Sequence, residues 1–206
     1  GPSFTLERET GYYTRTKYTA LGQESEWSDV TYFVTKGLPV YADDLFNTTL
    51  YSGDDSSSQP ALLNIGLDFT GKWLSWIKNR DSNSYDHFLS DSEHKNGDYH
   101  TYFASNDTYS KQAGGSGVTA TSTTGYTLAG GGGDFNKAGF NYVAWNFRAA
   151  PGFFDIVTYT GNSTAGHTIS HNLGSVPGMI MIKNTSNSEQ WQVWHRSVTG
   201  NLELDN

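Results

Sequence analysis

The chain has 206 residues and a net charge of −8, and 15% of its residues are aromatic. The negative charge argues against binding to nucleic acid or to an anionic membrane, and no apolar run approaches the roughly 18 residues of a membrane span. The sequence has no cysteine, which excludes disulfides, thiolate metal sites and cysteine catalysis. Its 23 glycines and many aromatic residues favour short strands and tight turns over helices.

The predicted strands are short and are separated by turn residues. Val143, Trp145 and Phe147 alternate with smaller or polar residues, which is the pattern of a half-buried strand. Residues 179–182 are a continuous apolar run, Met-Ile-Met-Ile, which predicts a strand covered on both faces. In the second half of the chain we expect strands at 126–129, 142–148, 153–160, 166–170, 179–184, 190–195 and 202–204.

An internal repeat joins the two halves of the chain. Three pairs of segments carry it: Tyr51-Ser52-Gly53 with Tyr159-Thr160-Gly161 (159 − 51 = 108), Asn64-Ile65-Gly66 with Asn172-Leu173-Gly174 (172 − 64 = 108), and Ile77-Lys78-Asn79 with Ile182-Lys183-Asn184 (182 − 77 = 105). A fixed period is stronger evidence of architecture than any single motif, so we predict a duplicated unit. We expect Gly53 and Gly161 to lie in equivalent turns with positive φ.

The predicted fold class is all-β. We expect two tandem related antiparallel β-sandwich units, jelly-roll-like, with almost no helix. The first unit spans residues 3–106 and the second spans residues 118–206, joined by a Gly/Ser-rich connection at 107–117.

A second division of the chain is equally compatible with the repeat. In this frame, residues 43–151 form one intact domain, and residues 3–40 together with 152–206 form the other. Both frames use a faint correspondence at the N-terminus, where Tyr32-Phe33-Val34 matches Tyr142-Val143-Ala144 (142 − 32 = 110) and Thr10-Gly11-Tyr12 matches Thr124-Gly125-Tyr126 (124 − 10 = 114). The sequence does not choose between the two frames.

The candidate catalytic and metal-binding residues are weak. His167 and His171 have the i, i+4 spacing of helical metal ligands but lie in a stretch typical of strand and turn. The acidic pairs at 43–44 and 54–55 adjoin turn residues, where aspartate usually caps a turn or faces solvent; glycosidase catalysis or a loose calcium-binding turn is the less favoured interpretation. We therefore predict no enzyme activity, no metal and no cofactor.

Four tryptophans are the only candidate ligand-binding residues. Trp73 and Trp76 would project from opposite faces of one strand, and so would Trp191 and Trp194. We expect one member of each pair to pack inside the protein and the other to lie nearer the surface. An exposed tryptophan can stack on a sugar ring, although packing is the favoured role.

Several motifs resemble one known family. They are Trp76-Ile77-Lys78-Asn79-Arg80, His87-Phe88-Leu89, Gly125-Tyr126-Thr127-Leu128, Tyr142-Val143-Ala144-Trp145, Ile169-Ser170-His171-Asn172-Leu173-Gly174 and Pro177-Gly178-Met179-Ile180. In order and spacing they resemble the repeat domains of tail-fibre-like or appendage structural proteins of tailed marine bacteriophages of the cyanophage type. The resemblance implies a location in the virion, other virion proteins as partners and a non-catalytic structural role in a tail fibre, head fibre or knob. It supplies no catalytic residue.

Two functions follow as expectations. The first is this structural module, which contacts other virion proteins and could contact the host surface. The alternative is a carbohydrate-binding module that recognises a surface polysaccharide through exposed aromatic residues. A small core in each repeat also predicts a homo-oligomer. The resemblance favours a trimer, with Trp73, Phe153 and Phe154 as candidates for the shared apolar patch.

Overall fold

A computed structural model describes residues 11–34, 41–55, 61–112, 117–129, 135–200 and 202–204. The chain divides into two units, residues 1–40 and residues 41–206. The described residues form antiparallel strands and one short 3-10 helix, η1 (Ala42–Asp44). The predicted all-β class is confirmed.

The described part of the first unit is a long β-hairpin. Its strands β1 (Gly11–Thr14) and β4 (Thr31–Val34) pair with each other, and β2 (Thr19–Ala20) pairs with β3 (Gln23–Glu24). Facing aromatic rings line the main pair, with Tyr13 and Tyr32 5.0 Å apart. Residues 3–10 and 35–40, which the predicted domains include, lie outside the described residues.

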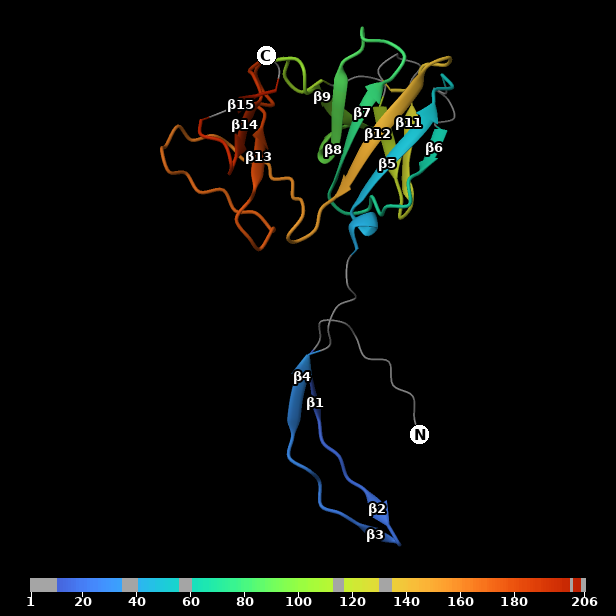
Figure 1. The fold of residues 1–206 in the computed structure, drawn as a ribbon, viewed down its shortest axis with the longest axis vertical. Coiled ribbons are helices and arrows are strands. Elements are labelled where there is room, and N and C mark those ends of the chain that lie inside the picture. The colour runs from blue at the N-terminus through green and yellow to red at the C-terminus, as the bar shows by residue number, and fades with distance from the viewer. Residues whose placement is uncertain are drawn as a thin grey trace. The chain divides into compact units, whose positions relative to one another are not determined.

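The second unit contains a β-sandwich (Figure 1). One of its sheets has five strands in the order β5-β12-β7-β8-β9, and the other has three in the order β10-β11-β6. The strands of the five-stranded sheet are β5 (Phe46–Ser52), β12 (Asn141–Arg148), β7 (Trp73–Asn79), β8 (His87–Asn96) and β9 (Tyr99–Ala104). Those of the three-stranded sheet are β10 (Gly117–Thr121), β11 (Gly125–Ala129) and β6 (Ala61–Asn64).

Strand β7 shows how the sequence builds this core. Its residues alternate between buried and half-buried from Trp73 to Asn79, because successive side chains point to opposite faces of a sheet. Trp73 and Ile77 point inward and are 1% and 0% exposed. They pack against Tyr126 of β11 and Tyr142 of β12 in one cluster of buried side chains drawn from both sheets.

The sandwich does not follow the predicted boundary at 107–117. Strand β12 comes after that boundary in the sequence, yet it pairs with β5 on one side and with β7 on the other. The two sheets therefore lie within residues 43–151, the intact domain of the second frame. Residues 113–116 of the expected connection lie outside the described residues, and its Gln112 pairs with Tyr102.

The N-terminal correspondence that both frames use has no structural counterpart. Strands β11 and β12 lie in different sheets, whereas β1 and β4, which the correspondence sets against them, pair directly with each other. The division after residue 40 also separates the segments 3–40 and 152–206, which that frame joins in one domain.

Residues 152–204 contribute one small sheet. It consists of β13 (Met179–Ile182), β14 (Gln192–His195) and β15 (Leu202–Glu203), in that order (Figure 1). The predicted strands at 153–160 and 166–170 are absent from these described residues. The tandem arrangement of two sandwiches is thus not confirmed, because a single sheet has no second layer of its own.

One face of the C-terminal sheet packs on the outer face of the sandwich. Trp191 lies against Leu89 and Phe103, and half-buried Met181 and Leu204 adjoin this second cluster. The indole Nε1 of Trp191 donates a hydrogen bond to the Ala104 carbonyl at 2.7 Å, and Lys183 Nζ donates to the Thr108 carbonyl at 2.8 Å.

The repeat reappears as two matching hairpins, β7–β8 and β13–β14. Asn79 Oδ1 accepts hydrogen bonds from the N–H groups two and three residues later, at 3.0 and 3.1 Å. Asn184 Oδ1 does the same at 2.9 and 3.1 Å. The preceding lysines, Lys78 and Lys183, each donate to a carbonyl across the loop. The predicted match of residues 77–79 with 182–184 is therefore confirmed at the hairpin level.

The repeat glycines that adopt positive φ are not the ones for which it was predicted. Gly66 and Gly174, which end the two Asn-x-Gly motifs, have φ of 77° and 68°, a region that favours glycine. The prediction of positive φ at Gly53 and Gly161 is wrong, since neither adopts it. Gly53 is constrained by space, because an added Cβ would collide with the Lys137 carbonyl, whereas Gly161 faces open space.

Candidate functional site

Two of the four candidate tryptophans are inside the protein. Trp73 is 1% exposed in the sandwich core, and Trp191 is 6% exposed between the C-terminal sheet and the sandwich. Neither ring can stack on a sugar without unfolding of the surrounding structure. Trp73 is for the same reason excluded from the patch that was expected to join subunits.

The other two tryptophans lie nearer the surface. Trp76 is half-buried on the outer face of β7, and its Nε1 is buried without a hydrogen-bond partner in the described structure. Trp194 of β14 is 38% exposed. Each pair thus has one buried and one more accessible member, and Trp194 is more exposed than Trp76.

Trp194 belongs to an apolar face of the C-terminal sheet. Its neighbour across the strands is Ile180, which is 40% exposed, and Ile182 beside it is 42% exposed. The prediction that residues 179–182 are covered on both faces is wrong. Only the Met181 face packs on the sandwich, so the face of Ile180, Ile182 and Trp194, here called the open face, meets solvent.

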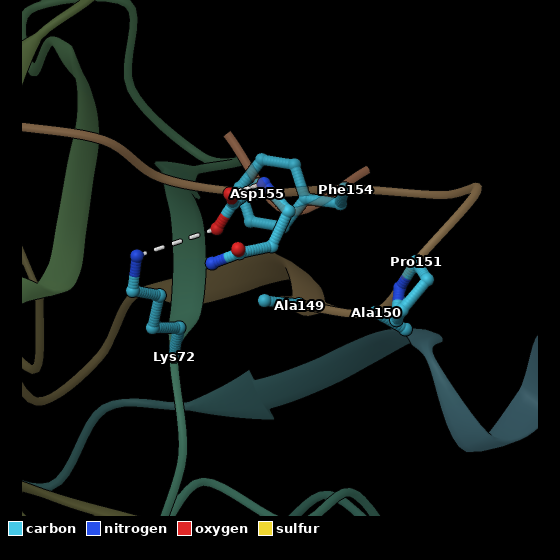
Figure 2. A pocket seen from close by; sticks show the side chains of 7 residues that line it. Lys72, Ala149, Ala150, Pro151, Phe154 and Asp155 are labelled. Atoms are coloured by element: carbon cyan, nitrogen blue, oxygen red, sulfur yellow. Dashed lines mark hydrogen bonds and ion pairs between the residues drawn. The ribbon is translucent and has the colours of Figure 1, made fainter. Parts of the chain in front are cut away.

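A small pocket lies where the chain leaves the sandwich (Figure 2). Its walls are formed by residues 149–151, Lys72, Phe154, Asp155 and Asn172. Lys72 Nζ lies 3.4 Å from Asp155 Oδ1 and donates to the Ile156 carbonyl at 2.6 Å. The Asn172 N–H donates to Asp155 Oδ2 at 2.8 Å.

The charges of this pocket hold the chain in place. The side chain of Asp155 is 5% exposed and that of Lys72 is 36% exposed. Burial raises the pKa of the Asp155 carboxyl, but the Asn172 N–H and the Lys72 ammonium lower it by more, so its pKa lies below the usual value. The carboxylate therefore stays ionised and ties the segment after the sandwich to the start of β7. Sequence reasoning missed this contact because Lys72 and Asp155 are far apart in the chain.

A second cluster of polar side chains, around Asp91, lies where the pairing of β8 with β9 is interrupted. The pairing of β8 with β9 shifts register between Ser90 and Lys95. Within this bulge Asp91 accepts hydrogen bonds from the N–H groups of Glu93 and His94, at 2.8 and 3.0 Å. His94 Nδ1 lies 3.0 Å from both Asp91 carboxylate oxygens. The carboxylate thus supplies the acceptors that the interrupted ladder lacks.

His100 completes this group from β9. Its Nδ1 donates to the Asp91 carbonyl at 2.8 Å, and its ring packs against Trp73. Burial lowers the pKa of His100, so the ring is neutral near pH 7. In the part of the chain that the structure describes, no cluster of three metal-ligating side chains forms. Asp91 and His100 therefore support the irregular pairing of β8 with β9.

The other histidine and aspartate candidates make contacts within the protein. His167 packs against Tyr159, and His171 Nδ1 accepts a hydrogen bond from the Leu173 N–H at 3.2 Å. Asp44 accepts a hydrogen bond from the Tyr41 N–H at 2.9 Å, which caps η1. Asp54 accepts one from Asn136 Nδ2 at 2.7 Å. Asp44 therefore caps a short helix, and Asp54 joins the loop after β5 to Asn136.

One family model matches residues 41–206, and its description is a domain of unknown function, DUF7483. The chain belongs to the DUF7483 family. The match begins at Tyr41, where the second structural unit begins, so the DUF7483 part comprises both the sandwich and the C-terminal sheet. Comparisons with curated proteins and with solved structures give no match. Among the described residues, no helix of the structure is long and apolar enough to cross a membrane.

Proposed function

We propose that this DUF7483 protein is a non-catalytic structural module of a phage virion appendage, such as a tail fibre, head fibre or knob. The observation that carries the structural role is the open face, where Ile180, Ile182 and Trp194 are each about 40% exposed on neighbouring strands. Contiguous exposed apolar side chains usually mark a surface that contacts another protein. The location in a virion is proposed because the repeat motifs resemble those of bacteriophage appendage proteins.

The buried groups support the same proposal. The polar clusters at Asp155 and at Asp91 use their hydrogen-bonding capacity to hold strands and loops together. An acid or base for catalysis needs a reacting group within hydrogen-bond reach in a cleft. Because these carboxylates are occupied by main-chain N–H groups, we assign them to stability.

The virion assignment is tested on particles. Antibodies raised against residues 41–206 should decorate a fibre or knob of purified tailed phage particles in immunogold electron microscopy. The same antibodies, first absorbed with the purified chain, are the control and should leave the particles unlabelled. Labelling that is absent from intact particles but present in the soluble lysate fraction contradicts the proposal.

The proposed assembly is a homo-oligomer, with a trimer favoured. Phe153 is 43% exposed and can contribute to a shared patch, whereas Phe154 is half-buried against Phe147. Sedimentation equilibrium should give the mass of a trimer, and Phe153→Asp should lower that mass without loss of the β-sheet circular dichroism spectrum. A monomer at high micromolar concentration contradicts the trimer.

A carbohydrate-binding role is the second candidate, and the exposure of Trp194 favours it. A flat indole with one free face can stack on a pyranose ring. If so, a glycan array should show a specific polysaccharide ligand, and Trp194→Ala should abolish its binding. Trp27→Ala, at an exposed tryptophan of the first unit, is the matched control and should leave glycan binding unchanged.

A further inference from the structure

Strand β13 lies at the edge of its sheet but has the composition of an interior strand. It is the outer member of the order β13-β14-β15 and consists of four apolar residues. By contrast β5, an edge strand of the sandwich, carries the polar residues Asn47, Thr48 and Thr49. An edge that combines unpaired main-chain groups with apolar side chains is a template for pairing with another strand. The composition of β13 therefore indicates a neighbour on each side.

The repeat identifies the neighbour that β13 lacks. Its counterpart β7 pairs with β8 on one side and with β12 on the other. In the described structure β13 pairs with β14, the counterpart of β8, and its other side is open. The open side thus corresponds to the side of β7 that β12 occupies. Residues 153–160, the counterpart of β5, form no strand, which fits because β5 pairs with β12 alone.

The side chains at the two hairpins also correspond. Ile77 faces Phe88 in the first hairpin, and Ile182 faces Gln192 in the second, so the offset is 105 on one strand and 192 − 88 = 104 on the other. With these offsets Ile180 and Ile182 are the repeat equivalents of Ser75 and Ile77. Ser75 and Ile77 are each 0% exposed in the sandwich core. The open face is therefore the counterpart of a face that the sandwich covers.

We propose that the open edge of β13 binds an antiparallel, β12-like strand of a partner polypeptide. No strand described in residues 41–206 pairs with this side of β13, and we assign the added strand to another polypeptide. Strand addition gains its affinity from main-chain hydrogen bonds and its specificity from alternate side chains. The inference uses the surface that carries the proposed function, but it does not depend on the virion assignment.

The register of β12 specifies the chemistry of the partner strand. Ala144 stands opposite Ile77 and would stand opposite Ile182. Asn146 stands opposite Ser75, whose Oγ donates to Asn146 Oδ1 at 2.8 Å. The counterpart of Ser75 is Ile180, whose apolar side chain offers no such donor and favours an apolar neighbour across the strands. The partner strand therefore has an apolar residue at the position equivalent to Asn146.

The probe is a labelled peptide of residues 139–151 in which Asn146→Val meets this requirement. Fluorescence anisotropy with the full chain should show saturable binding, and the unmodified peptide should bind several-fold more weakly. Hydrogen exchange should slow at residues 179–182 on binding, while exchange in β5 stays unchanged. Ile180→Lys in the full chain should weaken binding about tenfold, because an apolar contact is replaced by a charge.

Matched controls separate strand addition from simple apolar contact. The same peptide with Ala144→Pro keeps the apolar side chains but cannot form a regular strand, so it should not bind. Leu50→Lys, an exposed position on the β5 edge, should leave binding unchanged. The proposal is overturned if the proline peptide binds equally well, if protection appears at β5, or if no peptide binds. It is also overturned if the chain dimerises through β13 and Ile180→Lys abolishes that dimer, because the occupant is then a second copy.

Discussion

The β7–β8 and β13–β14 hairpins have the same loop contacts but different surroundings. In both, an asparagine Oδ1 accepts two main-chain hydrogen bonds and the preceding lysine bridges the loop. Yet β7 lies between two strands and under a second sheet, whereas β13 is an edge strand with an open face. The loop is specified by a few neighbouring residues. Burial of the strand depends on partners that are distant in the sequence.

The largest expected difference between the two regions concerns their buried tryptophans. Trp73→Ala should destabilise the sandwich by about 4 kcal/mol, since it removes a fully buried ring from the core that joins both sheets. Trp191→Ala should instead release the C-terminal sheet, because Trp191 joins that sheet to Leu89 and Phe103.

Two readouts distinguish these effects. Chemical denaturation should show a lower midpoint for the whole chain in Trp73→Ala. In Trp191→Ala, amide exchange should accelerate in β13–β15 while the strands of the sandwich keep their protection. Equal loss of protection in both regions after Trp191→Ala would show that they unfold as one unit.

A glycine pair at equivalent repeat positions should give a smaller but clear contrast. Gly53→Ala should cost about 3 kcal/mol, because the new Cβ collides with the Lys137 carbonyl and the backbone must shift. Gly161→Ala, its repeat counterpart, meets nothing within 4 Å and should leave the free energy of unfolding almost unchanged. Thermal denaturation of the two variants measures both values, and a similar loss in each would contradict the assigned surroundings.

The asparagine pair should give the smallest contrast. Asn79 is 1% exposed, so Asn79→Ala removes a buried acceptor and two partly buried hydrogen bonds and should cost about 2 kcal/mol. Asn184 is exposed, and water can replace its oxygen, so Asn184→Ala should cost about 0.5 kcal/mol. Denaturation curves for the two variants and for the parent chain test this order, which a larger loss in Asn184→Ala would reverse.

The sequence was informative where structure depends on nearby residues. The alternation in β12 predicted a strand, which is present, although Ala144 and Asn146 face the core and Trp145 and Phe147 do not. The Ile-Lys-Asn motif predicted equivalent positions in two repeats, and the two loops make the same contacts. Local pattern was insufficient for residues 179–182, whose apolar run predicted burial on both faces. That burial requires a neighbouring strand and a covering sheet, and among the described residues β13 has only β14 beside it.

The candidate site shows the same limit. One tryptophan of each pair was expected inside the protein, and Trp73 and Trp191 are buried. The ion pair of Lys72 with Asp155 joins residues 83 positions apart, and no motif or spacing announces it. The boundary at 107–117 also failed as a division of the sandwich, because the position of β12 between β5 and β7 is decided by long-range pairing.

Residue-resolved hydrogen exchange of the dilute, unliganded chain tests most directly that residues 152–204 are an open copy of part of the sandwich. The amides of β7 should exchange only with global unfolding, because strands pair with it on both sides. Alternate amides of β13, those that point away from β14, should exchange about as fast as amides of an unfolded chain. Slow exchange at every amide of residues 179–182, matching β7, would contradict the open edge.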